Sequence, residues 1–124
     1  MDPWKEKIRN FQRHFHNITE TGAMCGDGTP AGVYYSKGYG EGANKTIIYF
    51  NGGGWCYGFD NKSVANDCYY RTFTNLGSSS PTVPDPWTDQ LTYGDWYFSG
   101  DLNDDINFYN WNRFFFIYCD GTGH

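Results

Sequence analysis

Two short runs of consecutive apolar residues stand out along the chain, at residues 46–50 and 114–118. Both are rich in Ile, Phe and Tyr, and turn-forming residues follow each of them. A continuous apolar run of this length is typical of a strand covered on both faces, as in the parallel sheet of an α/β protein. A third strand is predicted at Gly32–Ser36, before a glycine-rich turn. The pattern therefore predicts an α/β fold in which the two apolar runs are central strands.

Helical periodicity is visible in two places. Near the N-terminus, four apolar residues follow a 4-3-4 spacing that predicts a packing helix within residues 1–20. They are Trp4, Ile8, Phe11 and Phe15. A short helix is also predicted near Val64–Leu76. It lies within a long region, roughly residues 58–113, that is rich in Asp, Asn, Ser, Pro and Tyr and contains no repeat. We interpret this region as a polar insertion between the two central strands.

The composition favours a folded protein and excludes some partners. Phe, Tyr and Trp make up 21% of the 124 residues, whereas disordered chains are poor in aromatic residues. The formal net charge is -5 and no Lys/Arg cluster is present, which argues against nucleic acid or an anionic membrane surface as a partner. No stretch approaches the ~20 apolar residues of a membrane span. At this length we expect one domain at most.

Three consecutive glycines, Gly52–Gly54, follow the first apolar run. No side chain obstructs the backbone N–H groups of such a segment, and N–H groups of this kind stabilise the oxyanion that forms during acyl transfer. In α/β-hydrolases a loop after the third strand supplies one of these groups. For a glycine triplet considered alone, a flexible or tight loop without chemistry is the competing interpretation.

The cysteines and the glycosylation motifs favour an oxidising, secretory compartment. The chain has four cysteines, an even number, and N-glycosylation sequons begin at Asn17, Asn44 and Asn61. Four of residues 2–7 are charged, so no apolar core of a signal peptide is visible there. Either the true N-terminus is missing or the protein is cytosolic, and the expectation of secretion rests at this point on the cysteines and the sequons.

Position along the chain favours one cysteine pairing. Cys56 and Cys68 flank the segment after the glycine triplet, so a disulfide between them would brace that loop. Cys25 and Cys119 would then pair with each other. Four cysteines allow three connectivities, and the other two stay open.

No metal site is expected. Zinc is a weak alternative to the disulfides because C-x2-C spacing is absent. Asp and Asn alternate over residues 101–107 as in a calcium loop, but the required Gly and the terminal Glu are missing. We interpret that segment as a solvated acidic turn.

Five segments occur in an order that resembles the pectin acetylesterase family, which includes the Notum-type carboxylesterases. These segments are Cys25–Tyr35, Asn51–Cys56, Leu76–Ser79, Tyr109–Arg113 and Tyr118–Gly121. The resemblance implies that residues 1–124 are a single incomplete domain, the N-terminal portion of an α/β-hydrolase. Its sheet would be mostly parallel, with the polar region as a long insertion.

The resemblance also implies a function, that of a serine carboxylesterase acting on an acetylated polysaccharide or a related acyl ester without a cofactor. Gly52, Gly53 and Gly54 would then form the oxyanion loop, and Trp55 would lie beside the acyl pocket. Asn51 departs from the acidic residue that the family commonly has before the glycines. Residues 122–124 depart from its usual Ser-Phe-like pair.

A complete catalytic triad cannot be named within the chain. The serine nucleophile of an ester hydrolase sits on a G-x-S-x-G elbow, and the resemblance places this elbow beyond His124. Ser78–Ser80 lacks a preceding apolar strand, and His14, His16 and His124 are the only histidines. We therefore expect these 124 residues alone to be inactive. The alternative functions are a non-catalytic carbohydrate-binding module, because Trp, Tyr, Asn and Asp suit a sugar platform, and a product without activity.

Overall fold

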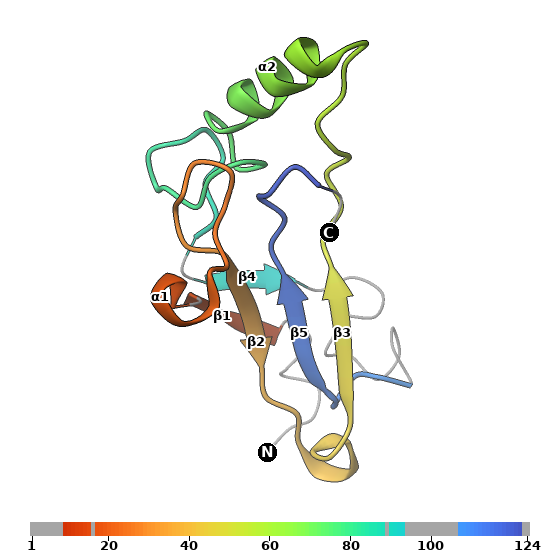
Figure 1. Ribbon diagram of the computed structural model, residues 1–124. Coiled ribbons are helices and arrows are strands. Elements are labelled where there is room, and N and C mark those ends of the chain that lie inside the picture. The colour runs from red at the N-terminus through yellow and green to blue at the C-terminus, as the bar shows by residue number, and fades with distance from the viewer. Residues whose placement is uncertain (1–8, 16, 89, 94–106, 123–124) are drawn as a thin grey trace. The chain divides into compact units, whose positions relative to one another are not determined.

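The structure, a computed structural model, describes residues 9–15, 17–88, 90–93 and 107–122. Five strands form one sheet in the order β3-β5-β2-β1-β4 (Figure 1). The strands are β1 (Arg9–Phe15), β2 (Gly32–Ser36), β3 (Thr46–Phe50), β4 (Gln90–Tyr93) and β5 (Asn112–Phe116). The helices are α1 (Ile18–Thr21), the short 3-10 helix η2 (Gly40–Gly42) and α2 (Asn61–Arg71). Neither described α-helix is long and apolar enough to cross a membrane.

The sheet is mixed. β1 and β4 are antiparallel. β3 and β5 are parallel, since hydrogen bonds join residue 112 to 45 near one end of the pair and residue 51 to 116 near the other. The arrows of these two strands point the same way in Figure 1. A parallel pair of this kind is expected in an α/β fold. The mostly parallel sheet of a larger domain stays a prediction.

The predicted N-terminal helix is wrong for residues 9–15, which form strand β1, and residues 1–8 lie outside the described part of the chain. A spacing of four, as between Phe11 and Phe15, fits one face of a helix but also one face of a strand. Pairing with β4, far along the chain, then decides in favour of the strand. Within the described N-terminal residues, helix forms only at α1, where the Asn17 side chain caps the first turn.

The three predicted strands are found in the structure close to their predicted positions, as β2, β3 and β5. β2 and β3 have the predicted bounds, and β5 begins and ends two residues earlier than residues 114–118. β4 was not predicted, because it lies in the polar region that we expected to contain a short helix at most. That helix is α2, which begins earlier and ends earlier than Val64–Leu76. A capping box of Asp60 and Ser63 fixes its start.

Within the described residues, β3 is not covered on both faces as we expected. β3 is the last strand in the sheet order, and Ile48, Tyr49 and Phe50 are 56%, 41% and 57% exposed. Tyr49 and Phe50 stack on Phe115 and Phe116 of β5, with ring centroids 5.2 and 5.1 Å apart. Because the adjacent strand covers one side of each ring, an aromatic run can form a strand without a layer on each face.

The chain divides into two compact units. The first comprises residues 1–14, 34–49 and 89–115, and the second comprises residues 15–33, 50–88 and 116–124. In the first unit the Asn112 side chain accepts hydrogen bonds from the Gly38 N–H and the Tyr35 hydroxyl and donates to two carbonyls of the turn before β3. The second unit contains the glycine triplet, α2, all four cysteines and the fully buried Tyr118.

Candidate functional site

The three glycines after β3 have different structural roles. Gly54 has a left-handed backbone, with φ +73°, that L side chains rarely adopt. A Cβ atom on Gly53 would overlap the ring of Tyr118 and lie 2.9 Å from Leu76 Cδ2, so only glycine allows this close approach. Gly52 faces open space. The triplet is therefore a defined turn packed against Tyr118, rather than a flexible linker.

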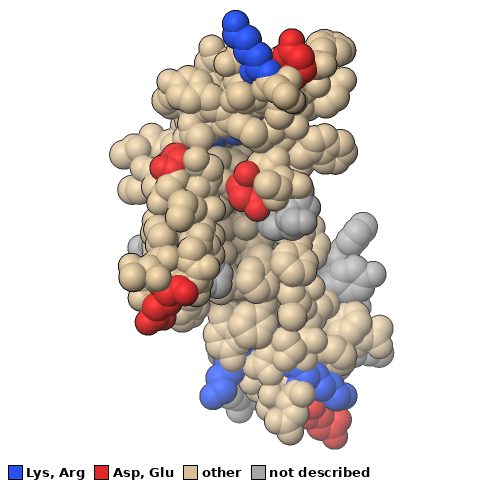
Figure 2. Space-filling model, viewed as in Figure 1, with Lys and Arg blue, Asp and Glu red and all other residues tan. Residues whose placement is uncertain are grey.

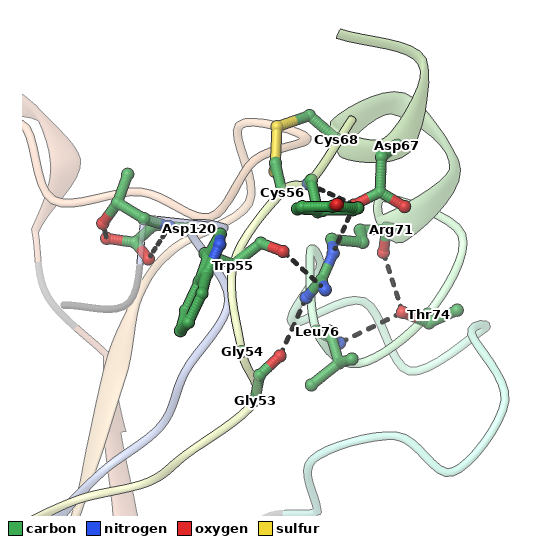
Figure 3. A network of polar contacts seen from close by, with 12 residues as sticks. Gly53, Gly54, Trp55, Cys56, Asp67, Cys68, Arg71, Thr74, Leu76 and Asp120 are labelled. Carbon is green, nitrogen blue, oxygen red and sulfur yellow. Dashed lines mark hydrogen bonds and ion pairs between the residues drawn. A yellow bond between two sulfur atoms is a disulfide. The ribbon is translucent and has the colours of Figure 1, made fainter. Parts of the chain in front are cut away.

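Side chains hold three successive carbonyl groups of this loop. Arg71 donates from Nη1 to the Gly53 oxygen and from Nη2 to the Trp55 oxygen, each over 2.9 Å. The Tyr118 hydroxyl donates to the Gly54 oxygen over 2.6 Å. Figure 3 shows the guanidinium group of Arg71 directed at the two carbonyls that it binds. The loop is thus anchored through its oxygens.

The N–H groups of the same loop are left available. Among the described residues, none accepts a hydrogen bond from the backbone N–H of residues 52–55. The next two amides are used, since Cys56 donates to the Gly121 oxygen over 2.9 Å and Tyr57 to Asp67 Oδ2 over 2.9 Å. In a trans peptide the N–H points opposite to the C=O of the same plane. The anchors therefore direct the Gly54 N–H away from Arg71 and the Trp55 N–H away from the Tyr118 hydroxyl.

Asp67 completes the anchoring of the loop. Its Oδ2 accepts from Arg71 Nε over 3.2 Å, an i,i+4 ion pair on α2, and also from the Tyr57 N–H. The hydrogen bond from the Tyr57 backbone, followed by that from Arg71, lowers the pKa of Asp67 below its usual value. Asp67 is therefore ionised at neutral pH and balances the charge of the guanidinium.

Two disulfides lie in the second unit. Cys56 is bonded to Cys68 and Cys25 to Cys119, with Cα–Cα distances of 5.1 and 4.8 Å. This is the pairing that the positions in the sequence favoured. The first bridge fastens the loop to α2, the helix that also carries Asp67 and Arg71. The second lies beside Tyr118, so covalent bonds support both anchors of the loop.

A pocket of about 220 Å³ lies against this network. Its lining includes Arg71, Tyr69, Asp120 and the Cys56–Cys68 disulfide. The Trp55 side chain is not part of this lining and is 63% exposed. Its predicted place beside an acyl pocket stays a prediction.

The serines after Leu76 stabilise a turn rather than forming a nucleophile site. Ser78 is fully buried, and its oxygen accepts from the Ser80 N–H over 3.0 Å. Burial raises the pKa of Asp27, but hydrogen bonds from Ser78 and Thr29 outweigh this effect and the pKa is lowered. A buried hydroxyl that donates to a carboxylate is not available to attack a substrate.

In the described part of the chain His14 is the only histidine, and it belongs to the first unit, whereas the loop belongs to the second. His14 is exposed, and its ring lies edge-on to Tyr35, with the centroids 6.3 Å apart. His16 and His124 lie outside the described residues, as do residues 101–106 of the calcium-like segment. In the described part of the chain, no three His, Cys, Asp or Glu side chains are grouped to hold a metal ion. The sequon residues Asn17, Asn44 and Asn61 are all exposed.

Sequence reasoning located the loop but missed the side chains that hold it. An acidic and a basic residue four apart in a predicted helix, as at Asp67 and Arg71, signal an ion pair, but not the carbonyls that the arginine binds. Tyr118 ends an apolar run and gives no signal of its hydrogen bond. Charged side chains are scattered over the face in Figure 2, where most of the surface is uncharged. This face presents no cluster of Lys and Arg.

Comparisons with known proteins identify similar chains. A family described as pectinacetylesterase matches residues 7–124. Pectin acetylesterase 4 of Arabidopsis thaliana is 36% identical over 109 residues, which cover 85% of this chain and 24% of that protein. Pectin acetylesterase 7 of the same plant is 37% identical over 113 residues, with coverages of 88% and 25%. The chain spans about a quarter of the length of these relatives.

Proteins from animals are also similar to this chain. Palmitoleoyl-protein carboxylesterase notum1a of Danio rerio is 29% identical over 117 residues, which cover 94% of this chain and 21% of that protein. A solved structure of the Wnt deacylase Notum from Drosophila superimposes with a TM-score of 0.66 at 26% identity and covers 91% of this chain and 28% of that one. The described fold is therefore similar to that of about a quarter of the Notum chain.

Proposed function

Because this chain belongs to the pectinacetylesterase family, we propose that it supplies the oxyanion-binding loop of a carboxylic-ester hydrolase. One observation carries the proposal. The loop at residues 52–55 is fastened through its carbonyl oxygens by Arg71 and Tyr118, while its N–H groups have no acceptor among the described residues. Fixed and unused N–H donors are what a developing oxyanion requires.

The proposed reaction is serine acyl transfer without a cofactor. A serine attacks the ester carbonyl, and the carbonyl oxygen gains negative charge as the tetrahedral intermediate forms. N–H groups of the loop formed by Gly52, Gly53, Gly54 and Trp55 donate to that oxygen. The intermediate collapses as the ester C–O bond breaks and the alcohol leaves with a proton, and water then hydrolyses the acyl-enzyme to free serine and the carboxylic acid. One such donor contributes roughly 3 kcal/mol in the transition state.

The nucleophile is proposed to lie in a part of a longer polypeptide beyond these 124 residues. Two observations support this proposal. The chain contains no G-x-S-x-G elbow, and it spans about a quarter of the length of the relatives that it matches. Residues 1–124 would then be one incomplete domain of an α/β-hydrolase with a mostly parallel sheet and a long polar insertion. The exposed side chains of β3 at the end of the sheet support a fold that continues there.

The substrate is proposed to be an acetylated polysaccharide. The names of the plant relatives support an acetyl ester of pectin, whereas the name of the fish relative indicates a fatty acyl ester on a protein. The face in Figure 2 carries scattered charges and no cluster of Lys and Arg, which is compatible with both. The two disulfides and the exposed sequon residues Asn17, Asn44 and Asn61 support secretion.

The test uses the protein in its full natural length, produced in a secretory host. We expect it to hydrolyse p-nitrophenyl acetate, to release acetate from acetylated pectin and to react with a serine-directed fluorophosphonate. The chain of 124 residues is the control and is expected to do none of these. Absence of hydrolysis and of labelling in the full-length protein would refute the proposal, and serine-dependent turnover by the 124-residue chain would refute the missing nucleophile.

A carbohydrate-binding module is the second candidate function, and exposed aromatic rings favour it. Trp55, Tyr57 and Phe59 are 63%, 64% and 95% exposed, and Tyr57 and Phe59 contact each other edge-on. Exposed rings of this kind can stack on sugars. Saturable binding of a glycan by a protein without esterase activity would support this function over the first.

A further inference from the structure

We propose that Arg71 and Asp67 are positioning residues, whose role is to fix the orientation of the Gly54 and Trp55 N–H groups without touching the substrate. The catalytic consequence of this inference rests on the proposed function. The orientation itself does not, because it follows from hydrogen bonds within the second unit.

Arg71 binds the loop in a way that a single point charge cannot reproduce. Its planar guanidinium group reaches three acceptors at once: Nε to Asp67, Nη1 to the Gly53 oxygen and Nη2 to the Trp55 oxygen. The two carbonyls belong to the Gly53–Gly54 and Trp55–Cys56 peptides, which flank the Gly54–Trp55 peptide whose carbonyl Tyr118 holds. Because the group is rigid and planar, the two peptide planes are fixed relative to each other.

A glycine triplet needs such an external support. Glycine has the largest conformational freedom of any residue, and ordering it costs correspondingly more entropy. Gly54 also has a left-handed φ that places its neighbouring peptide planes at a sharp turn. Without the two hydrogen bonds from Arg71, the Gly53–Gly54 peptide would lose its side-chain anchor, and Tyr118 alone would hold the Gly54–Trp55 peptide. The N–H groups would then lose the preorganisation on which stabilisation of an oxyanion depends.

Asp67 and the end of α2 hold Arg71 in turn. Asp67 Oδ2 accepts from both Arg71 Nε and the Tyr57 N–H, which ties the guanidinium to the chain just beyond the disulfide of Cys56. The Arg71 carbonyl accepts from the backbone N–H and the hydroxyl of Thr74, over 3.0 and 2.8 Å. Figure 3 shows these contacts converging on Arg71. Both the side chain and the backbone of this residue are therefore fixed.

The test compares three variants in the protein of full natural length. Arg71→Lys keeps the charge but cannot bind both carbonyls and Asp67 together. Asp67→Asn keeps the shape but removes the charge. Lys62→Ala, an exposed change on the same helix, is the matched control. For p-nitrophenyl acetate we expect Arg71→Lys to lower kcat on the order of 100-fold and to leave KM within about threefold.

Asp67→Asn is expected to lower kcat on the order of 10-fold, and Lys62→Ala to leave it unchanged. Affinity for a boronate, which mimics the tetrahedral oxyanion, should fall by the same factors as kcat/KM. A merely structural role would instead reduce the amount of folded enzyme without this parallel. If Arg71→Lys does not fold, Asp67→Asn carries the same comparison.

A second readout is independent of activity. In 15N-labelled protein, Arg71→Lys should shift the amide resonances of Gly54 and Trp55 and lower their order parameters, whereas Lys62→Ala should not. If the wild type hydrolyses no ester, the proposed function fails while this readout still tests the positioning. Unchanged Gly54 and Trp55 amides in Arg71→Lys, or kcat within about threefold of the wild type, would overturn the inference.

Discussion

Gly53→Ala is predicted to be the most destabilising alanine substitution in the glycine triplet. Gly53 has no left-handed backbone, so the cost arises from packing alone. The new Cβ would overlap the ring of Tyr118, lying 2.5 Å from its Cε1 atom, and would lie 2.9 Å from Leu76 Cδ2. Tyr118 is fully buried, so its ring has little space into which to move.

The magnitude follows from two contributions. Overpacking of a filled site costs typically 1–3 kcal/mol, so we assign about 2 kcal/mol to the displaced ring. If the ring moves, the hydrogen bond from the Tyr118 hydroxyl to the Gly54 oxygen is lost, at a further cost of about 1 kcal/mol. The expected loss in the free energy of unfolding is therefore about 3 kcal/mol. Gly54→Ala should lower the free energy of unfolding by about 1 kcal/mol, because alanine is strained at the left-handed φ of this residue.

Gly52→Ala is the matched control, since nothing lies within 4 Å of its added Cβ atom. We expect its free energy of unfolding to stay within about 0.5 kcal/mol of the wild type. The assay is urea unfolding with the disulfides intact, followed by tryptophan fluorescence. With an m-value of about 2 kcal/mol/M, Gly53→Ala should lower the urea midpoint by roughly 1.5 M. Equal midpoints for Gly53→Ala and Gly52→Ala would refute the packing of the loop against Tyr118.

Three further predictions follow from the same contacts. Tyr118→Phe removes the hydroxyl that donates to the Gly54 oxygen and should lower the free energy of unfolding by about 1 kcal/mol. Urea unfolding measures this loss, and an unchanged free energy would contradict the 2.6 Å hydrogen bond. Because hydrogen bonds from Tyr57 and Arg71 lower the pKa of folded Asp67, this group stabilises the fold above its unfolded pKa, and the stabilisation disappears as pH falls through the lowered value. Thermal melting of the wild type and Asp67→Asn should therefore differ at neutral pH and converge in acid, and a constant difference would count against the ion pair. Replacing Cys25 and Cys119 by alanine should lower the free energy of unfolding by roughly 4–5 kcal/mol, because that disulfide closes a loop of 94 residues. Replacing Cys56 and Cys68 should lower it by roughly 3 kcal/mol, because their loop spans 12 residues. The reverse order in urea unfolding would contradict this expectation.

Local sequence patterns predicted strands β2 and β3. β2 and β3 were found within their predicted bounds because β-branched and aromatic runs bounded by glycine favour strand wherever they pair. The N-terminal segment failed because a spacing of four between apolar residues suits a strand and a helix alike. Its partner β4 has a polar, weakly patterned sequence that gives little signal. Both segments are strands because they pair with each other across a long separation in sequence.

The position of the candidate loop could be predicted from the sequence, but the side chains that hold it could not. The glycine triplet after an apolar run, together with the resemblance to the family, marks the loop. Its anchors are distant, since Arg71 lies 18 residues from Gly53 and Tyr118 lies 64 residues from Gly54. Nothing in the local sequence of either residue indicates a carbonyl acceptor. Only the fold brings these donors to the loop.

The most direct test of the account is a crystal structure of the protein in its full natural length after reaction with a serine-directed organophosphonate. We expect the phosphonyl oxygen to accept hydrogen bonds from the backbone N–H groups of Gly54 and Trp55, with Arg71 still bound to the carbonyls of Gly53 and Trp55. A phosphonyl oxygen bound elsewhere, with these amides directed away from it, would contradict the assignment of residues 52–55 as the oxyanion-binding loop.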